Sequence, residues 1–122
     1  SLQEIVRLVG KDTLSFEDQL KLEAAKSIRE DYLQQNAFHE QDTFTSLAKQ
    51  DKMLNMVLNF YYQAKRALES NVYINAILSL EVRENIARAK YLSEEEIGKI
   101  DEIDKEVVRK IDELISKQAE VM

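Results

Sequence analysis

Residues 29–38, REDYLQQNAF, carry the side chains of this chain that are best suited to binding a flat ring. Tyr32 and Phe38 are aromatic residues six positions apart, and Gln34 and Gln35 place two amides between them. Aromatic faces stack on planar ligands, and a few polar groups at the rim of an apolar pocket orient the ligand. The segment therefore predicts a slot for a purine base. Residue types alone favour another interpretation, in which both rings are core residues that close a helix end.

A second segment, residues 12–18 with the sequence DTLSFED, combines three acids with a good helix N-cap at Ser15. Asp12, Glu17 and Asp18 are expected to be exposed at the start of a helix, where carboxylates favour the positive end of the helix dipole. Residue types favour a solvated cap whose acids serve only that dipole. The alternative is an acidic helical corner that contacts a basic protein partner.

The composition predicts an all-α, single-domain bundle of about five helices. The 122 residues include no Pro, Cys or Trp and only two Gly, so the chain lacks the residues that turns and sheets require. Apolar residues recur at helical spacing over residues 2–9, 15–33, 47–69 and 72–91, and from 97 to 114 behind a cap at Ser93.

The third of these helices, residues 47–69, is the most hydrophobic and is predicted to form the centre of the core. Its most buried residues are expected to be Met53, Val57, Phe60 and Ala64. In the fourth helix, Tyr73 and Ile77 are candidates for burial, whereas the polar residues 34–46 are predicted to be a loop. Ser93 and Glu96 fit a capping box before the fifth helix.

Charge and residue usage exclude several classes of function. The net charge of −6 argues against binding of nucleic acid, which requires basic patches. The apolar runs are too short to span a bilayer, and the chain does not open on a signal peptide, so we expect a soluble, cytoplasmic protein. His39 is the only histidine, and no convergent ligand set or catalytic arrangement accompanies it, so we expect neither a metal site nor a catalytic centre.

Both segments resemble the C-terminal helical domain of the catalytic A subunit of archaeal-type and vacuolar-type rotary ATPases. In that family a segment like LQEIVRLVGKD, residues 2–12, precedes a helix that ends in a segment like IREDYLQQNAF, residues 28–38. The related F-type beta subunit carries DELSEED where this chain has DTLSFED. The resemblance has specific motifs over residues 2–69, and over the helical extension 70–122 it rests on helical character and length.

The resemblance implies a role for each segment. Phe38 and Tyr32 would line the adenine pocket, and Gln34 and Gln35 would meet the edge of the base or the phosphate-side backbone. Contact with the central rotor stalk would fall to Asp12, Leu14, Ser15, Phe16, Glu17 and Asp18. Thr13 and Phe16 replace two acids of the F-type motif, so we expect this contact to depend on bulk more than on charge.

The function implied is that of a domain in a rotary ATP synthase, which couples ATP synthesis or hydrolysis to proton or sodium transport. The chain begins at Ser1 without Met and contains no phosphate-binding loop, so we expect a piece of a larger subunit that lacks its nucleotide-binding domain. The full-length subunit would be an enzyme that uses ATP or ADP with magnesium, while the 122 residues alone would be inactive and hold no cofactor.

The expected partners are the B subunits and the central-stalk subunits of the soluble ATPase head, which lies peripheral to the membrane without inserting into it. Composition without the motifs favours a different function, that of a stand-alone helical module that binds another protein.

Overall fold

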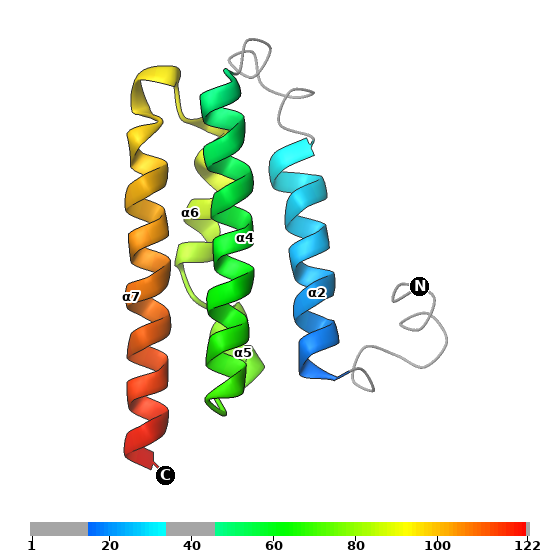
Figure 1. Cartoon of the computed structure of the whole chain (residues 1–122), viewed down its shortest axis with the longest axis vertical. Helices are drawn as coiled ribbons and strands as arrows, with labels where there is room; N and C mark the ends of the chain where they lie inside the picture. The colour runs from blue at the N-terminus through cyan, green and yellow to red at the C-terminus, as the bar shows by residue number, and fades with distance from the viewer. Residues whose placement is uncertain (1–14, 34–45, 122) are drawn as a thin grey trace, which may run out of the picture.

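The structure, a computed structural model, describes residues 15–33 and 46–121, and both ranges are mainly helical (Figure 1). Neither range contains a strand, which confirms the all-α prediction. The helix expected over residues 2–9 and most of the loop expected over 34–46 lie outside the described residues. The elements, in chain order, are α2 (Phe16–Ser27), the π-helix η2 (Ile28–Leu33), α4 (Leu47–Glu69), α5 (Ile74–Leu78), α6 (Val82–Arg88), the 3₁₀ turns η4 (Ala89–Tyr91) and η5 (Glu94–Glu96), and α7 (Gly98–Val121).

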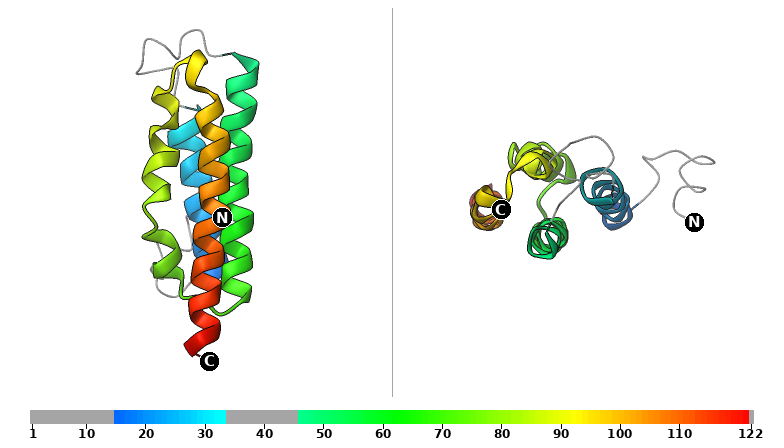
Figure 2. Two further views of the ribbon diagram at one scale, coloured as in Figure 1. Left: turned by 90° about the vertical axis from the view of Figure 1, so that its left-hand side faces the viewer. Right: turned by 90° about the horizontal axis from the view of Figure 1, so that it is seen from above.

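The long helices α2, α4 and α7 run side by side, with α4 between the other two (Figure 1). Seen from above, the α5–α6 column lies across from α4 and completes a four-column bundle (Figure 2). The N-terminus of α2 lies at the same end of the bundle as α5, while η2, the start of α4 and the α6–α7 connection lie at the opposite end (Figure 1). The start of α2 and the end of η2 therefore lie toward opposite ends of the bundle.

The core forms where α4 meets α7 and the α5–α6 column. Helix α4 has the bounds predicted from periodicity, and the four residues expected to be most buried, Met53, Val57, Phe60 and Ala64, are all buried. From α7, Ile100, Val107 and Ile111 are fully enclosed. Removal of such apolar surface from water contributes about 25 cal/mol per Å². The burial of apolar side chains between α4 and α7 therefore contributes substantially to the stability of the bundle.

The connection after α4 is a Schellman motif, which explains the break expected at Ser70 and Asn71. Asn71 has a φ of 67°, in the left-handed region that Asn tolerates better than most residues. The N–H of Val72 donates to the carbonyl of Ala67 and the N–H of Asn71 donates to that of Leu68, both at 3.0 Å. These bonds satisfy carbonyls that the helix end leaves free, and buried Val72 begins the return of the chain.

The prediction of one continuous helix over residues 72–91 is wrong, because α5 and α6 are separate helices followed by the turn η4. Ile77 and Val82 are both buried, yet on an ideal helix residues five apart point about 140° away from each other. A break at residues 79–81 allows both side chains to enter the core. Two side-chain donors satisfy carbonyls at this break: Ser79 Oγ donates to Asn75 O at 2.6 Å, and Arg83 Nη1 donates to Leu78 O at 2.9 Å.

The capping box predicted at Ser93 and Glu96 is present. The Ser93 N–H and the Ser93 hydroxyl both donate to Glu96 Oε1, at 3.1 and 3.0 Å. The turn that it caps is the 3₁₀ element η5, and α7 begins two residues later at Gly98. Hydrogen bonds from Lys99, and then from Ser93, lower the pKa of the Glu96 carboxyl to about 2. The carboxylate is therefore charged over the whole physiological range.

Candidate functional site

The structure describes part of each predicted site. The corner from Ser15 to Asp18 is described in full, and Tyr32 is placed in η2 by its backbone. The predicted proximity of the Tyr32 and Phe38 rings stays a prediction. Five of the predicted site residues lie outside the described residues: Asp12, Leu14, Gln34, Gln35 and Phe38.

Ser15 is the N-cap of α2, as its residue type predicts. Its Oγ accepts a hydrogen bond from the N–H of Asp18 at 3.1 Å, and Glu17 and Asp18 occupy the first turn, at the positive end of the helix dipole. Glu17 also lies 3.5 Å from the Nζ of Lys65 on α4, with both side chains close to half exposed. An ion pair with that exposure contributes at most about 1 kcal/mol, so this contact holds the Glu17 side chain only weakly.

Phe16 gives the corner an exposed aromatic surface. Its side chain is 47% exposed and packs edge-to-face on Tyr73, with ring centroids 5.8 Å apart and planes at 80°. The prediction that Tyr73 is buried is wrong: it is 59% exposed, and it precedes the short helix α5 as its N-cap residue. Sequence reasoning therefore missed Tyr73 as a member of this surface. The contact joins residues 57 positions apart, so no local pattern could have indicated it.

The opposite end of α2 changes helical register. Residues Ile28–Leu33 form a π-helix, an uncommon conformation that occurs often at functional sites. The backbone carbonyl of Glu30 in this segment accepts a hydrogen bond from Lys90 Nζ at 3.4 Å. The π-helix thus places Tyr32 at the last described turn before residues 34–38, the segment with the predicted purine slot.

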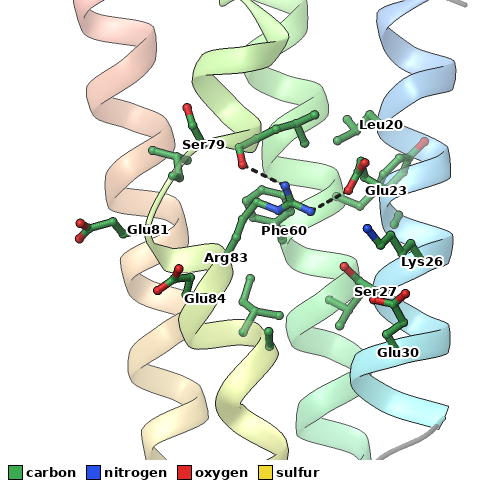
Figure 3. Close-up of a pocket in the computed structure, with 17 residues that line it drawn as sticks. Leu20, Glu23, Lys26, Ser27, Glu30, Phe60, Ser79, Glu81, Arg83 and Glu84 are labelled. Carbon is green, nitrogen blue, oxygen red and sulfur yellow. Dashed lines mark hydrogen bonds and ion pairs between the residues drawn. The ribbon is translucent and has the colours of Figure 1, made fainter. Parts of the chain in front are cut away.

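A groove of about 490 Å³ lies between α2 and the break that separates α5 from α6, with Phe60 of α4 at its floor (Figure 3). Arg83 crosses the groove: Nη2 lies 2.8 Å from Glu23 Oε2, and the guanidinium carbon lies 5.9 Å from the centroid of the Phe60 ring. Nη1 donates to the Leu78 carbonyl. Because this guanidinium already has an ion-pair partner, a carbonyl and a ring face, its arrangement joins three elements and does not indicate a catalytic group.

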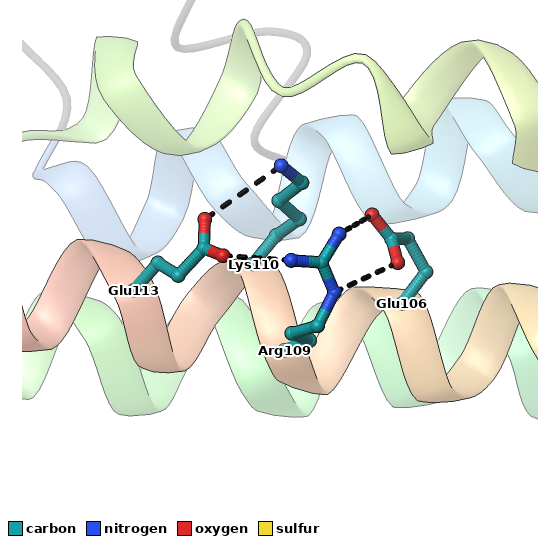
Figure 4. A network of polar contacts seen from close by, with 4 residues as sticks. All are labelled: Glu106, Arg109, Lys110 and Glu113. Atoms are coloured by element: carbon teal, nitrogen blue, oxygen red, sulfur yellow. Dashed lines mark hydrogen bonds and ion pairs between the residues drawn. The ribbon is translucent and has the colours of Figure 1, made fainter.

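The exposed face of α7 carries acidic and basic side chains that pair along the helix, as expected for a solvated face (Figure 4). Arg109 bonds Glu106 and Glu113, at 2.6 and 2.7 Å, and Lys110 lies 3.6 Å from Glu113. The hydrogen bond from Arg109 lowers the pKa of Glu106, and the same bond raises the pKa of Arg109. These i,i+3 and i,i+4 pairs support the helix and leave no carboxylate pair poised for proton transfer in this network.

Within residues 15–33 and 46–121, no group of three or more His, Asp or Glu side chains is arranged to hold a metal ion. In the same ranges, no helix is long and apolar enough to cross a membrane. The geometry therefore describes a helical lobe with an exposed aromatic corner at one end and a π-helix at the other.

Comparison with known proteins decides the family. The family model described as "C-terminal domain of V and A type ATP synthase" matches residues 1–78. The chain belongs to this family. It is 62% identical over 117 residues to the V-type ATP synthase alpha chain of Clostridium perfringens (strain 13 / Type A), and 65% identical over 117 residues to that of Clostridium botulinum (strain Hall / ATCC 3502 / NCTC 13319 / Type A).

These alignments cover 96% of this chain and 20% of each relative, so the chain spans about a fifth of the length of the curated relatives it matches. The predicted assignment to the C-terminal domain of the A subunit, which the relatives call the alpha chain, is confirmed. The similarity to the relatives also continues past residue 78, where the family model ends. The helices α6 and α7 therefore belong to the part of the chain that these relatives share.

Proposed function

We propose that this chain is the lobe of a rotary ATP synthase subunit that responds to nucleotide at one end and displaces the central stalk at the other. The observation that carries the proposal is the continuity of α2 and η2. These elements follow one another from Phe16 to Leu33, have 12 and 6 residues, and together span about 25 Å. The corner proposed to contact the stalk lies at one end of this rod, and Tyr32 lies in the last turn at the other.

Packing supports movement of the lobe as one body. Helix α2 lies against α4, and Arg83 ties it to the α5–α6 column through Glu23. Displacement at the nucleotide end would therefore be passed along α2 instead of being absorbed by it. Closure of a domain around a ligand, with rigid elements carrying the motion, is an established type of conformational switch.

At the nucleotide end, Phe38 and Tyr32 stack on the adenine of ATP or ADP, and Gln34 and Gln35 lie at the rim of the pocket. Base–aromatic stacking is worth about 1–3 kcal/mol per base, too little to hold a nucleotide without groups that bind its phosphates. Magnesium and the phosphates are held by other parts of the full-length subunit, which is the ATPase. Accordingly, the 122-residue chain alone is expected to show no ATP turnover.

At the other end, the corner formed by Asp12, Leu14, Ser15, Phe16, Glu17 and Asp18 presses on the central stalk. Phe16 and its edge-to-face partner Tyr73 supply exposed bulk. Charge contributes less, because exposed ion pairs are worth about 0–1 kcal/mol and salt screens them. The central-stalk subunits and the B subunits are the proposed partners, within a soluble cytoplasmic head that is peripheral to the membrane.

The proposal is tested with two variants of the full-length subunit in the assembled complex, each measured for the KM for ATP and for torque. Phe38→Ala is expected to raise the KM for ATP and leave torque at saturating ATP unchanged. Phe16→Ala is expected to lower the torque of ATP-driven rotation under load and leave the KM unchanged. Tyr62→Ala, at a tyrosine of α4 that is 61% exposed, is the matched aromatic control and should change neither.

The outcome that contradicts the proposal is a Phe38→Ala or Phe16→Ala complex that behaves like the Tyr62→Ala control. A second comparison separates bulk from charge at the corner. Neutralising Asp12, Glu17 and Asp18 together is expected to cost less torque than Phe16→Ala. If the neutral variant stalls at the lower load, charge and not shape transmits the force.

A further inference from the structure

One face of α2 contacts the α5–α6 column at two successive levels. At the start of the helix, the Phe16 ring packs edge-to-face on Tyr73, which precedes α5. Glu23 lies seven residues further along α2 and pairs with Arg83 of α6 at 2.8 Å. Seven residues are almost two full turns of an α-helix, so Phe16 and Glu23 project from the same face. The helix and the column therefore run in the same direction, with α5 beside the start of α2 (Figure 1).

The second of these contacts crosses a hollow. The groove of about 490 Å³ separates α2 from the break between α5 and α6, and the Arg83 side chain extends across it to Glu23 (Figure 3). The two side chains are 28% and 15% exposed, so solvent and salt screen their attraction less than that of a surface pair. At this level α2 is thus held to the column by a charged side-chain contact that spans the groove.

The guanidinium group is itself fixed from the side of the core. Nη1 of Arg83 donates to the Leu78 carbonyl at 2.9 Å, and the guanidinium carbon lies 5.9 Å from the centroid of the Phe60 ring on α4. A planar guanidinium with several directed donors loses little further freedom when it binds a carboxylate. Arg83 therefore offers Glu23 a pre-positioned partner, and the contact sets where this turn of α2 lies relative to the column.

The Arg83 contact is stronger than the contacts that join α2 and η2 to the column on either side of it. The pair of Phe16 and Tyr73 consists of rings that are about half exposed. At the other end, Lys90 Nζ donates to the Glu30 carbonyl of η2 at 3.4 Å, which is long for a hydrogen bond. A short, charge-assisted bond between partly buried groups exceeds both in strength.

We propose that Arg83 is a positioning residue for the corner of α2: acting through Glu23, it holds α2 against the α5–α6 column when the central stalk resists the surface formed by Phe16 and Tyr73. Glu23 lies about 10 Å along the helix axis from Phe16, close enough for the contact to stop the start of α2 from tilting into the groove. The inference rests on the proposed contact of this corner with the stalk. Arg83 lies beyond residue 78, where the match to the family model ends.

The test compares Arg83→Met with Arg88→Met in the full-length subunit of the assembled complex. Met keeps an apolar stem of similar length, and Arg88 is an exposed arginine of the same helix, so the control removes the same charge from α6. Arg83→Met is expected to lower the torque of ATP-driven rotation under load, with the KM for ATP and the unloaded kcat unchanged. Arg83→Lys should recover only part of the torque, because one ammonium group cannot reproduce the planar fork.

Hydrogen exchange gives a second readout on described residues. The amides of α2 are expected to exchange roughly fivefold to thirtyfold faster in Arg83→Met than in Arg88→Met, while those of α4 and α7 stay as protected as in the wild type. Glu23→Met should have the same effects, and it leaves Arg83 in place on Leu78 and Phe60. Unchanged exchange in α2 would overturn the proposal. So would a loss of torque that appears only together with loss of protection in α4 and α7, which would assign Arg83 to general stability.

Phe16→Ala separates failure of this inference from failure of the proposed function. If Phe16→Ala lowers the torque and Arg83→Met does not, the positioning role is wrong and the stalk contact stands. If Phe16→Ala leaves the torque unchanged, the proposed stalk contact is wrong and the positioning role falls with it. If both act, the double variant should lose less torque than the sum of the two single losses, because both residues act at one corner. Fully additive losses would overturn that dependence.

Discussion

Replacing Lys49 by Met tests whether a buried ammonium group joins α4 to the α6–α7 connection. Met retains most of the apolar stem that fills this 2%-exposed position, so the change removes the charge and its hydrogen bonds without opening a large cavity. The variant leaves the carbonyls of Lys90 and Leu92 without the donor that lies 3.0 and 2.8 Å away in the native protein.

The magnitude follows from two opposing effects. Hydrogen bonds to a charged group contribute about 1.5–3 kcal/mol each, so the two bonds together favour the native side chain. Removing a buried ammonium also relieves its desolvation cost of several kcal/mol, which offsets part of this loss. We expect a net destabilisation of about 2 kcal/mol, since water replaces the lost donor only partly at the carbonyls of Lys90 and Leu92 in the variant. At the unfolding entropy typical of a 122-residue domain, this lowers Tm by roughly 8 °C.

The assay is urea unfolding of the 122-residue chain, followed by circular dichroism, with the slope m checked for constancy. Lys52→Met is the matched control on the same helix face. The Nζ of Lys52 pairs with Asp101 at 2.8 Å, but the two side chains are 33% and 55% exposed, so the loss should stay below about 1 kcal/mol. Equal losses in the two variants, or a Lys49→Met protein as stable as the wild type, would refute the reasoning.

Three further predictions concern stability. The pKa of Glu96 is about 2 in the folded protein against an ordinary value of 4.5, so its contribution to the free energy of unfolding is fully present above pH 4.5 and is lost as the pH falls toward 2. In urea unfolding, the stability advantage of the wild type over Glu96→Gln should therefore shrink across that interval. Burial raises the pKa of Asp104, so its charge opposes folding at neutral pH; Asp104→Asn should raise Tm there, and the gain should vanish in acid, where the native carboxyl is protonated. Ile111→Ala should cost about 2–5 kcal/mol because the side chain is fully buried, whereas Val121→Ala, at a residue 81% exposed, should cost less than about 0.5 kcal/mol in the same assay.

The parts of the fold that the sequence predicts correctly depend on groups close together in the chain. Ser15 caps α2 through an N–H three residues away, and Ser93 and Glu96 form a capping box over the same spacing. The bounds of α4 follow from a sustained apolar stripe, which also identifies its buried residues. The motifs over residues 2–69 further indicated the family, although the proposed contact of Phe38 with adenine stays a prediction.

The features that sequence reasoning missed depend on how segments far apart in the chain pack against one another. The break between α5 and α6 is held by Arg83, which also pairs with Glu23, 60 residues earlier. Tyr73 is 59% exposed, and its ring contacts that of Phe16, from a helix 57 positions earlier in the chain. Local propensity describes α5 and α6 as one helix, since it contains no information on which faces the neighbouring columns will cover.

The sequence by itself therefore determined the helical class, most helix ends, the central helix and the family, because capping, periodicity and motif spacing act within a few residues. Only the tertiary structure decided which residues the α6–α7 connection contacts. In the sequence, Glu94 is one of three acids at a helix start, yet in the bundle it accepts hydrogen bonds from both the N–H and the hydroxyl of Ser46, 48 residues away. That contact exists because packing brings two helix starts to the same end of the molecule, and no local pattern specifies such an arrangement.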